Sequence, residues 1–303
     1  MNTNWQSFFI SRRGTELGMM IARNTGPRTA KSVIDMVSRL ASHNQDSPLV
    51  RSARLNQAIV RGLPQDSPEL DQIVRRVIKN AGWAYYYAYN RIARGPEHIH
   101  QAVTFAPEFQ TRLQETLSAG RGAVLVGAHV GNVDLAFQAA GNMLENVQAI
   151  TVGAPPEGYQ SQNQIRAQTG IDITPGDADA VKAAFRRLQE GGIVGTASDR
   201  PLPDANPKRY VRFFGHLAPL PTGHVRLAVR TNARVHMIQV TPEDKGRISI
   251  SLSPAIPLER SNGRSKDALV NTERILKYTE EQIRANPDWW LMFFPVWPQL
   301  LPS

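Results

Sequence analysis

From about residue 101 onward, short apolar segments alternate with segments of helical periodicity. The apolar segments predict strands at 123–126, 147–152, 193–197, 211–214, 235–240 and 248–252. The periodic segments predict helices at 130–143, 161–168, 222–231 and 265–285, and one more that Asp177 caps and Gly191-Gly192 ends. Alternation of this kind is typical of an α/β fold, and we expect a mixed sheet flanked by helices.

The first hundred residues carry helical patterns instead. Pro27 opens a segment with an apolar stripe, and Pro48 and Pro64 delimit a second helix. The clearest helix begins at Ser67-Pro68-Glu69, has apolar side chains every three or four residues, and stops at Gly95-Pro96. With 303 residues, the chain favours one large domain with an appendage. We therefore predict a helical N-terminal region, 1–100, and an α/β core, 101–303.

Composition limits the chemistry and the partners. Cysteine is absent, which excludes a thiolate nucleophile, a disulfide framework and a cysteine-ligated metal. Lysine and arginine number 35 against 26 aspartates and glutamates, a net charge of +9 that suits an anionic partner. The basic residues are spread out and no nucleic-acid-binding module is recognisable, so we expect an acidic membrane surface or a phosphate-rich ligand and no nucleic acid.

The N-terminus leaves two interpretations open. No apolar stretch is long enough to span a bilayer and no signal-peptide pattern is present, so we expect the protein to stay on the side where it is made. Trp5, Phe8 and Phe9 nevertheless precede Arg12 and Arg13. This segment either lies in a membrane interface, with the arginines at the headgroups, or forms a first helix packed on the core.

The strand predicted at 123–126 runs into Gly127-Ala128 and then His129, with Asp134 five residues further on. The carboxyl end of a strand is where α/β sheets place their chemistry. If a helix begins near Val130, Asp134 lies about one turn along it, and its carboxylate can accept the Nδ1 proton of His129. Nε2 is then free to take a proton from a hydroxyl. No serine or cysteine nucleophile stands beside this pair, which favours direct attack by a substrate hydroxyl on an activated acyl group.

Further polar residues that could take part in chemistry follow another predicted strand or lie within a predicted helix. Asp199-Arg200 comes directly after the strand at 193–197, and Arg166 lies in the helix at 161–168. If the strands at 123–126 and 193–197 are parallel neighbours, these side chains converge on one cleft. The alternatives are structural: a histidine packed after a strand, Asp134 solvated near a helix start, an Asp199-Arg200 ion pair, and Arg166 capping its helix.

The ordered set of motifs resembles the bacterial lysophospholipid and lipid A acyltransferase family, which includes lipid A lauroyl and myristoyl transferases and phosphatidylinositol mannoside acyltransferases. The resemblance covers the H-x-G-N-x-D segment at 129–134, the strand followed by Asp199-Arg200, Phe213-Phe214-Gly215, and Pro221-Thr222-Gly223 with its helix. It departs from the lipid A enzymes at 293–297, where Phe-Phe-Pro-Val-Trp replaces a basic, histidine-bearing segment. That departure puts the acceptor in question and leaves the base in place.

The resemblance implies a glycerolphosphate-acyltransferase-like core and transfer of a fatty acyl group from acyl-CoA or acyl carrier protein to a lipid-linked hydroxyl. It implies no bound cofactor and no metal, and a peripheral location at the cytoplasmic face of the inner membrane. His129 becomes the general base and Asp134 its orienting partner. The implied substrate-binding residues are Gly131 and Asn132 at the thioester pocket, Asp199 orienting the acceptor or the histidine, Arg166 facing donor phosphates or an oxyanion, and Arg200.

Two rival functions remain. A thioesterase would use the same histidine to activate water in place of a lipid hydroxyl. A non-catalytic basic protein would dock on anionic membranes through its N-terminal aromatic residues.

Overall fold

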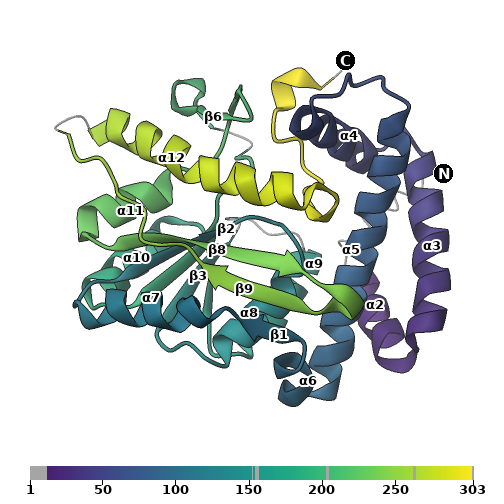
Figure 1. Cartoon of the computed structure of the whole chain (residues 1–303), viewed down its shortest axis with the longest axis horizontal. Coiled ribbons are helices and arrows are strands. Elements are labelled where there is room, and N and C mark those ends of the chain that lie inside the picture. Colours follow the sequence, from purple (N-terminus) through teal and green to yellow (C-terminus); the bar gives the residue numbers. More distant parts are fainter. Residues whose placement is uncertain (1–11, 152, 154–156, 203–204, 262–263, 302–303) are drawn as a thin grey trace.

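A seven-stranded sheet forms the centre of the computed structural model, which describes residues 12–151, 153, 157–202, 205–261 and 264–301 (Figure 1). The strand order is β1-β9-β8-β2-β5-β3-β4. The strands are β1 Val103–Phe105, β2 Ala123–Gly127, β3 Val147–Thr151, β4 Asp172–Pro175, β5 Ile193–Ala197, β8 Arg234–Pro242 and β9 Ile248–Leu252. The β8 and β9 strands pair antiparallel and the other neighbouring pairs are parallel. The predicted α/β fold with a mixed sheet is confirmed.

Helices cover both faces of the sheet, and the central strand β2 shows why. Successive strand residues point to opposite faces. Val124 and Val126 pack into a core that α10 Ala178–Gln189, α11 Gly223–Thr231 and α12 Arg264–Ala285 close. Ala123 and Leu125 pack into the opposite core with α7 Pro107–Ser118 and α8 Val133–Gly141. Burial on both faces explains why this strand is apolar throughout and does not alternate with polar residues.

The N-terminal region is helical, as predicted. Its helices are α2 Arg12–Asn24, α3 Pro27–His43, α4 Pro48–Arg61, α5 Glu69–Arg94 and α6 Pro96–His100. The long α5 packs against α2, α3 and α4 (Figure 1). Trp5, Phe8 and Phe9 lie outside the described residues. Among the helices that the structure describes, none is both long enough and apolar enough to cross a bilayer.

The remaining elements are short. A two-stranded antiparallel hairpin, β6 Val211–Phe213 with β7 His216–Ala218, packs on α12. The other short elements are the helix α9 Glu157–Ala167 and the 3-10 turns η1 Pro207–Arg209, η2 Asp244–Gly246, η3 Pro287–Trp289 and η4 Pro298–Leu300.

Residues 286–297, which we call the C-terminal strap, return from the end of α12 to the N-terminal helices, where Figure 1 shows the yellow end of the chain beside α4. The side-chain amide of Asn56 on α4 donates to the strap carbonyls of Met292, at 3.0 Å, and Phe294, at 2.8 Å. Asp288 of the strap pairs with Arg61, at 2.5 Å, and Arg76, at 3.1 Å. Helices α4 and α5 therefore fix where the strap runs.

Candidate active site at the carboxyl edge of the sheet

The carboxyl ends of β2 and β5 lie side by side. The two strands are parallel neighbours, and Gly127 is in register with Ala197. His129 and Asp199 each follow their strand by two residues, so the register brings them to the same point of the sheet edge. The sequence-based condition for convergence, that these two strands be parallel neighbours, is confirmed.

Asp199 binds His129 at two points. Nδ1 of the imidazole lies 2.7 Å from Oδ1 of Asp199, and the backbone N–H of His129 donates to Oδ2 at 2.8 Å. The Asp199 side chain is fully buried, whereas 31% of the His129 side chain is exposed. The imidazole is thus held from its buried side and open on the other.

The carboxylate determines which imidazole nitrogen can act as a base. Burial works to raise the pKa of Asp199, but the charge of His129 and the hydrogen bonds from His129 and Trp290 outweigh it and hold this pKa below its usual range. An ionised carboxylate only accepts hydrogen bonds, so Nδ1 carries the proton. When the imidazole is neutral, the lone pair is therefore on Nε2, which has no hydrogen-bond partner among the described residues.

The prediction that Asp134 accepts the Nδ1 proton is wrong, because Asp199 occupies that position. The prediction assumed a helix from Val130, but α8 begins at Val133. Gly131 has a positive φ of 73°, and the side-chain oxygen of Asn132 caps the helix by accepting from the Leu135 N–H. His129 therefore lies outside the helix, and helical spacing does not relate it to Asp134.

Asp134 instead forms an ion pair with Arg166 of α9. Nε of Arg166 lies 2.8 Å and Nη2 2.6 Å from Oδ1 of Asp134. Arg166 also donates to the side-chain oxygen of Asn163 at 3.1 Å, and its guanidinium carbon lies 5.3 Å from the ring centroid of Phe137. These contacts connect α9 to α8. A role for Arg166 toward donor phosphates or an oxyanion stays a prediction.

Gly131 and Asn132 build the turn that carries His129. The N–H of Gly131 donates to the carbonyl of Trp289 at 2.9 Å, and a Cβ added at Gly131 would lie 3.2 Å from the Val240 side chain. The side-chain amide of Asn132 donates to the carbonyl of Ala84 on α5 at 2.8 Å. These contacts connect the turn to both the strap and the N-terminal helices. Whether the two residues also shape a thioester pocket stays a prediction.

Arg200 and the strap lie next to each other. The guanidinium carbon of Arg200 is 4.0 Å from the centroid of the Phe294 ring, which is a cation–π contact. A role for Arg200 in substrate binding stays a prediction.

Sequence reasoning missed Trp290. The sequence indicates core packing for the aromatic segment 289–294, and the Trp290 side chain is indeed buried. However, its indole N–H donates to Oδ2 of Asp199 at 2.8 Å. A buried tryptophan generally needs an acceptor for this N–H, which was the available hint, but nothing in the sequence identified the acceptor.

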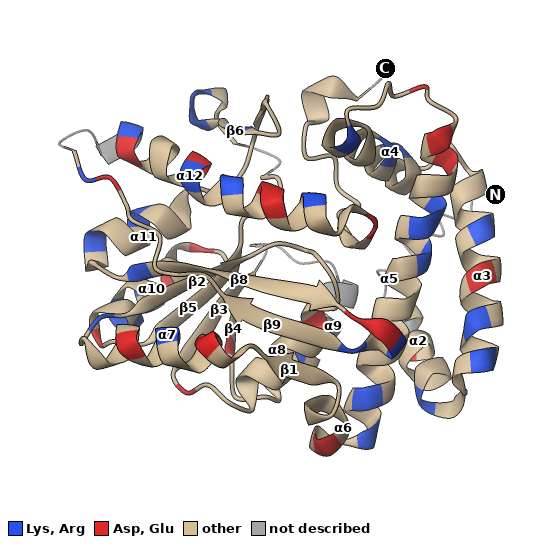
Figure 2. Ribbon diagram, in the orientation of Figure 1, with Lys and Arg blue, Asp and Glu red and all other residues tan. Residues whose placement is uncertain are grey.

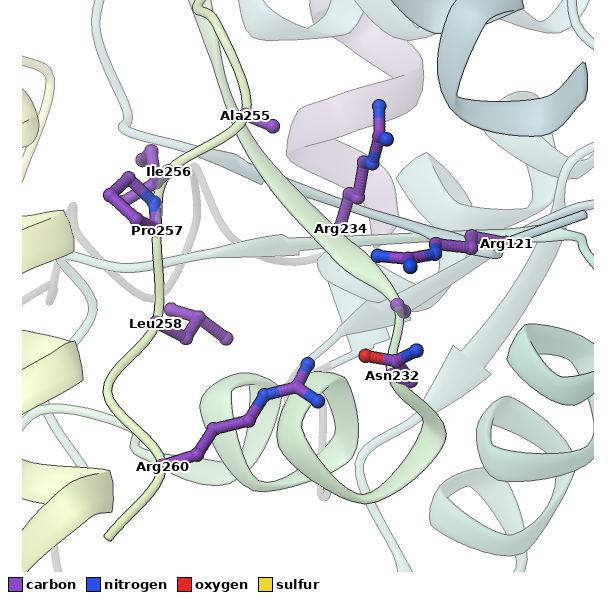
Figure 3. Close-up of a pocket in the computed structure, with 9 residues that line it drawn as sticks. Arg121, Asn232, Arg234, Ala255, Ile256, Pro257, Leu258 and Arg260 are labelled. Atoms are coloured by element: carbon purple, nitrogen blue, oxygen red, sulfur yellow. The ribbon is translucent and has the colours of Figure 1, made fainter. Parts of the chain in front are cut away.

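No cluster of histidine, aspartate and glutamate side chains within the described ranges is arranged to hold a metal ion. A pocket of about 180 Å³, lined by Arg121, Arg234 and Arg260, lies at the opposite edge of the sheet (Figure 3). It is at that edge because Arg121 precedes β2 and Arg234 begins β8. It is therefore separate from the His129 site.

Comparison with known proteins identifies the family. The family model of the bacterial lipid A biosynthesis acyltransferases matches residues 15–299. The chain belongs to this family. The match takes in the N-terminal helices, the sheet and the strap, so the whole arrangement around His129 lies within the lipid A biosynthesis acyltransferase homology.

Curated relatives of this acyltransferase family member include phosphatidylinositol mannoside acyltransferases. The protein of that name from Mycobacterium tuberculosis is 27% identical over 189 residues, which cover 61% of this chain and 57% of the relative. The one from Mycolicibacterium smegmatis is 24% identical over 295 residues, covering 95% of this chain and 91% of the relative.

Proposed function

We propose that this protein is a lipid acyltransferase that moves a fatty acyl group from a CoA or acyl carrier protein thioester to a sugar hydroxyl of a glycolipid. His129 is the general base and Asp199 orients it. The observation that carries the proposal is the 2.7 Å contact between His129 and a fully buried Asp199 at the carboxyl edge of the sheet. Family membership and the names of the relatives support the acyl-transfer chemistry and the glycolipid acceptor.

The reaction needs one base and no covalent intermediate. Nε2 of His129 takes the proton of the acceptor hydroxyl as its oxygen attacks the thioester carbon. The tetrahedral intermediate collapses, the carbon–sulfur bond breaks, and the thiolate leaves with the acyl group now esterified to the acceptor. The imidazolium returns its proton to the thiolate, so His129 ends the cycle neutral. Asp199 stabilises the imidazolium while it exists.

The test is an assay with radiolabelled palmitoyl-CoA, or the same acyl group on a carrier protein, with and without phosphatidylinositol mannoside vesicles. We expect labelled ester to form on the glycolipid and thiol release to depend on the acceptor. Acceptor-independent release of free fatty acid would instead identify a thioesterase. Absence of both products from every thioester, with vesicle binding retained, would identify the non-catalytic membrane protein.

We further propose that α2 and α3 dock on an anionic phospholipid surface, on the cytoplasmic side where thioester donors are available. Met36 and Leu40 lie one turn apart on α3 and are 55% and 66% exposed, and Met20 on α2 is 56% exposed. The exposed cations Arg28 and Arg39 lie on the same helix, where Figure 2 shows several basic residues. Exposed apolar side chains beside cations favour an interfacial helix.

Replacing both Met36 and Leu40 with glutamate is expected to weaken binding to phosphatidylglycerol-containing vesicles at least ~10-fold, because apolar burial and charge attraction are both lost. Vesicle co-sedimentation of the full chain measures this. Val181→Glu is the matched control, since Val181 is 47% exposed on α10 of the core. Equal loss in both variants, or no loss in the double variant, contradicts docking through α3.

A further inference from the structure

We propose that Trp290 is a positioning residue that holds the Asp199 carboxylate in the orientation that His129 requires. This inference rests on the proposed function for its consequence in catalysis. The geometry of the three hydrogen bonds on Asp199 involves only residues of this chain and does not depend on the proposed function.

The carboxylate of Asp199 receives three hydrogen bonds that together fix its plane. Oδ1 faces Nδ1 of His129, and Oδ2 receives the His129 backbone N–H and the indole N–H of Trp290, each at 2.8 Å. The two donors to Oδ2 come from different parts of the chain: the His129 N–H follows the end of β2, and the Trp290 indole lies on the strap. Rotation of the carboxylate about its Cβ–Cγ bond would break both, so Oδ1 stays directed at the imidazole.

Trp290 is itself held firmly. Trp290 forms an isolated antiparallel β-bridge with Val130, and the N–H of the next residue, Leu291, donates to the carbonyl of His129 at 2.8 Å. The indole is 1% exposed and packs edge-to-face on Phe213, with ring centroids 6.3 Å apart, and on Trp297, at 6.4 Å. The strap that carries it is anchored to α4 through Asn56 and Asp288. The donor therefore reaches Asp199 from a rigid support.

Without the indole N–H, Oδ2 keeps only the backbone donor of His129. A fully buried carboxylate cannot replace the lost bond with bulk water, so it gains freedom to turn. The imidazole then samples orientations in which Nε2 points away from the acceptor hydroxyl. Trp290 does not reach the reacting atoms, so substrate binding should be unaffected.

Trp290→Phe is therefore expected to lower kcat ~10-fold and to leave KM within about twofold. A second variant carries β-(3-benzothienyl)alanine at position 290, which keeps the bicyclic shape and replaces the N–H with sulfur, and should show the same loss. The matched control is Trp297→Phe. Trp297 is fully buried in the same aromatic cluster, but its indole nitrogen has no hydrogen-bond partner among the described residues, so kcat should stay within about twofold.

NMR of the protein with labelled histidine supplies a readout that needs no turnover. The wild type and Trp297→Phe should show a protected, downfield Nδ1–H proton for His129, and both variants at position 290 should lose it to exchange broadening. If the benzothienyl variant keeps both the wild-type kcat and this resonance, or if Trp297→Phe loses as much as Trp290→Phe, positioning by Trp290 is refuted. If the wild type transfers no acyl group but the resonance still depends on the indole N–H, the proposed function fails and the positioning role stands.

Discussion

Replacing His129 with alanine is expected to lower the rate of acyl transfer by ~10²–10⁴-fold, the usual contribution of a general base. The loss arises because no other group replaces the Nε2 lone pair beside the acceptor hydroxyl. Since 31% of the imidazole is exposed, its removal should leave the fold intact. The measurement is initial rate with a palmitoyl thioester and glycolipid vesicles, together with a thermal melt of each protein.

His98→Ala is the control for this variant. His98 is an exposed histidine on α6, so its loss should change neither the rate nor the melting temperature. A folded His129→Ala variant that keeps more than about a tenth of the wild-type rate would show that the base is another residue.

The second large effect is expected for Asp199→Asn, a loss of ~10²–10⁴-fold in kcat. The asparagine oxygen can replace Oδ2 and accept from the His129 N–H and Trp290. Its NH2 group then faces Nδ1, and because it is a donor, it forces Nδ1 to accept. The imidazole proton moves to Nε2, which can no longer take the proton of the acceptor hydroxyl. The variant keeps the shape of the site and inverts the tautomer.

Asp134→Asn is the matched comparison, because sequence alone pointed to Asp134. This substitution weakens the ion pair with Arg166, in which the two side chains are 20% and 14% exposed. Because most of both side chains is buried, losing the negative charge is expected to cost about 2 kcal/mol of stability, with less than about a fivefold change in kcat. Steady-state rates and urea unfolding of both variants decide between the two aspartates. A larger rate loss for Asp134→Asn than for Asp199→Asn would overturn the assignment of the orienting carboxylate.

Local patterns in the sequence were sufficient for most elements of the core, but they did not predict the edge strands β1 and β4 or the helix α7. The apolar strand before His129 was predicted at 123–126 and is found as Ala123–Gly127, and the strand before Asp199 was predicted at 193–197 and is found there. Asp177 caps α10 through the Ala180 N–H, as its position before an apolar helix predicts. Such features depend on neighbours within a few residues, so sequence order reports them directly.

Local sequence patterns could not identify the carboxylate that hydrogen-bonds to His129. Asp134 is five residues from His129 and Asp199 is seventy, and helical spacing favoured the near one. Gly131 and Asn132 end the turn before α8 starts, which removes the spacing argument, and the register of β2 with β5 brings the distant carboxylate into contact. The sequence contained Asp199-Arg200 as a candidate but offered no way to rank it above Asp134.

The sequence by itself determined most of the helices and strands, the absence of a cysteine nucleophile and the place of a histidine at a strand end, because each depends on residue type and short-range spacing. Only the tertiary structure decided that His129 contacts Asp199 and that the Trp290 indole donates to Asp199. It also decided that the N-terminal helices anchor the strap on which Trp290 lies. These contacts join residues 70 to more than 200 positions apart, and they exist because strand register and helix packing bring those segments together.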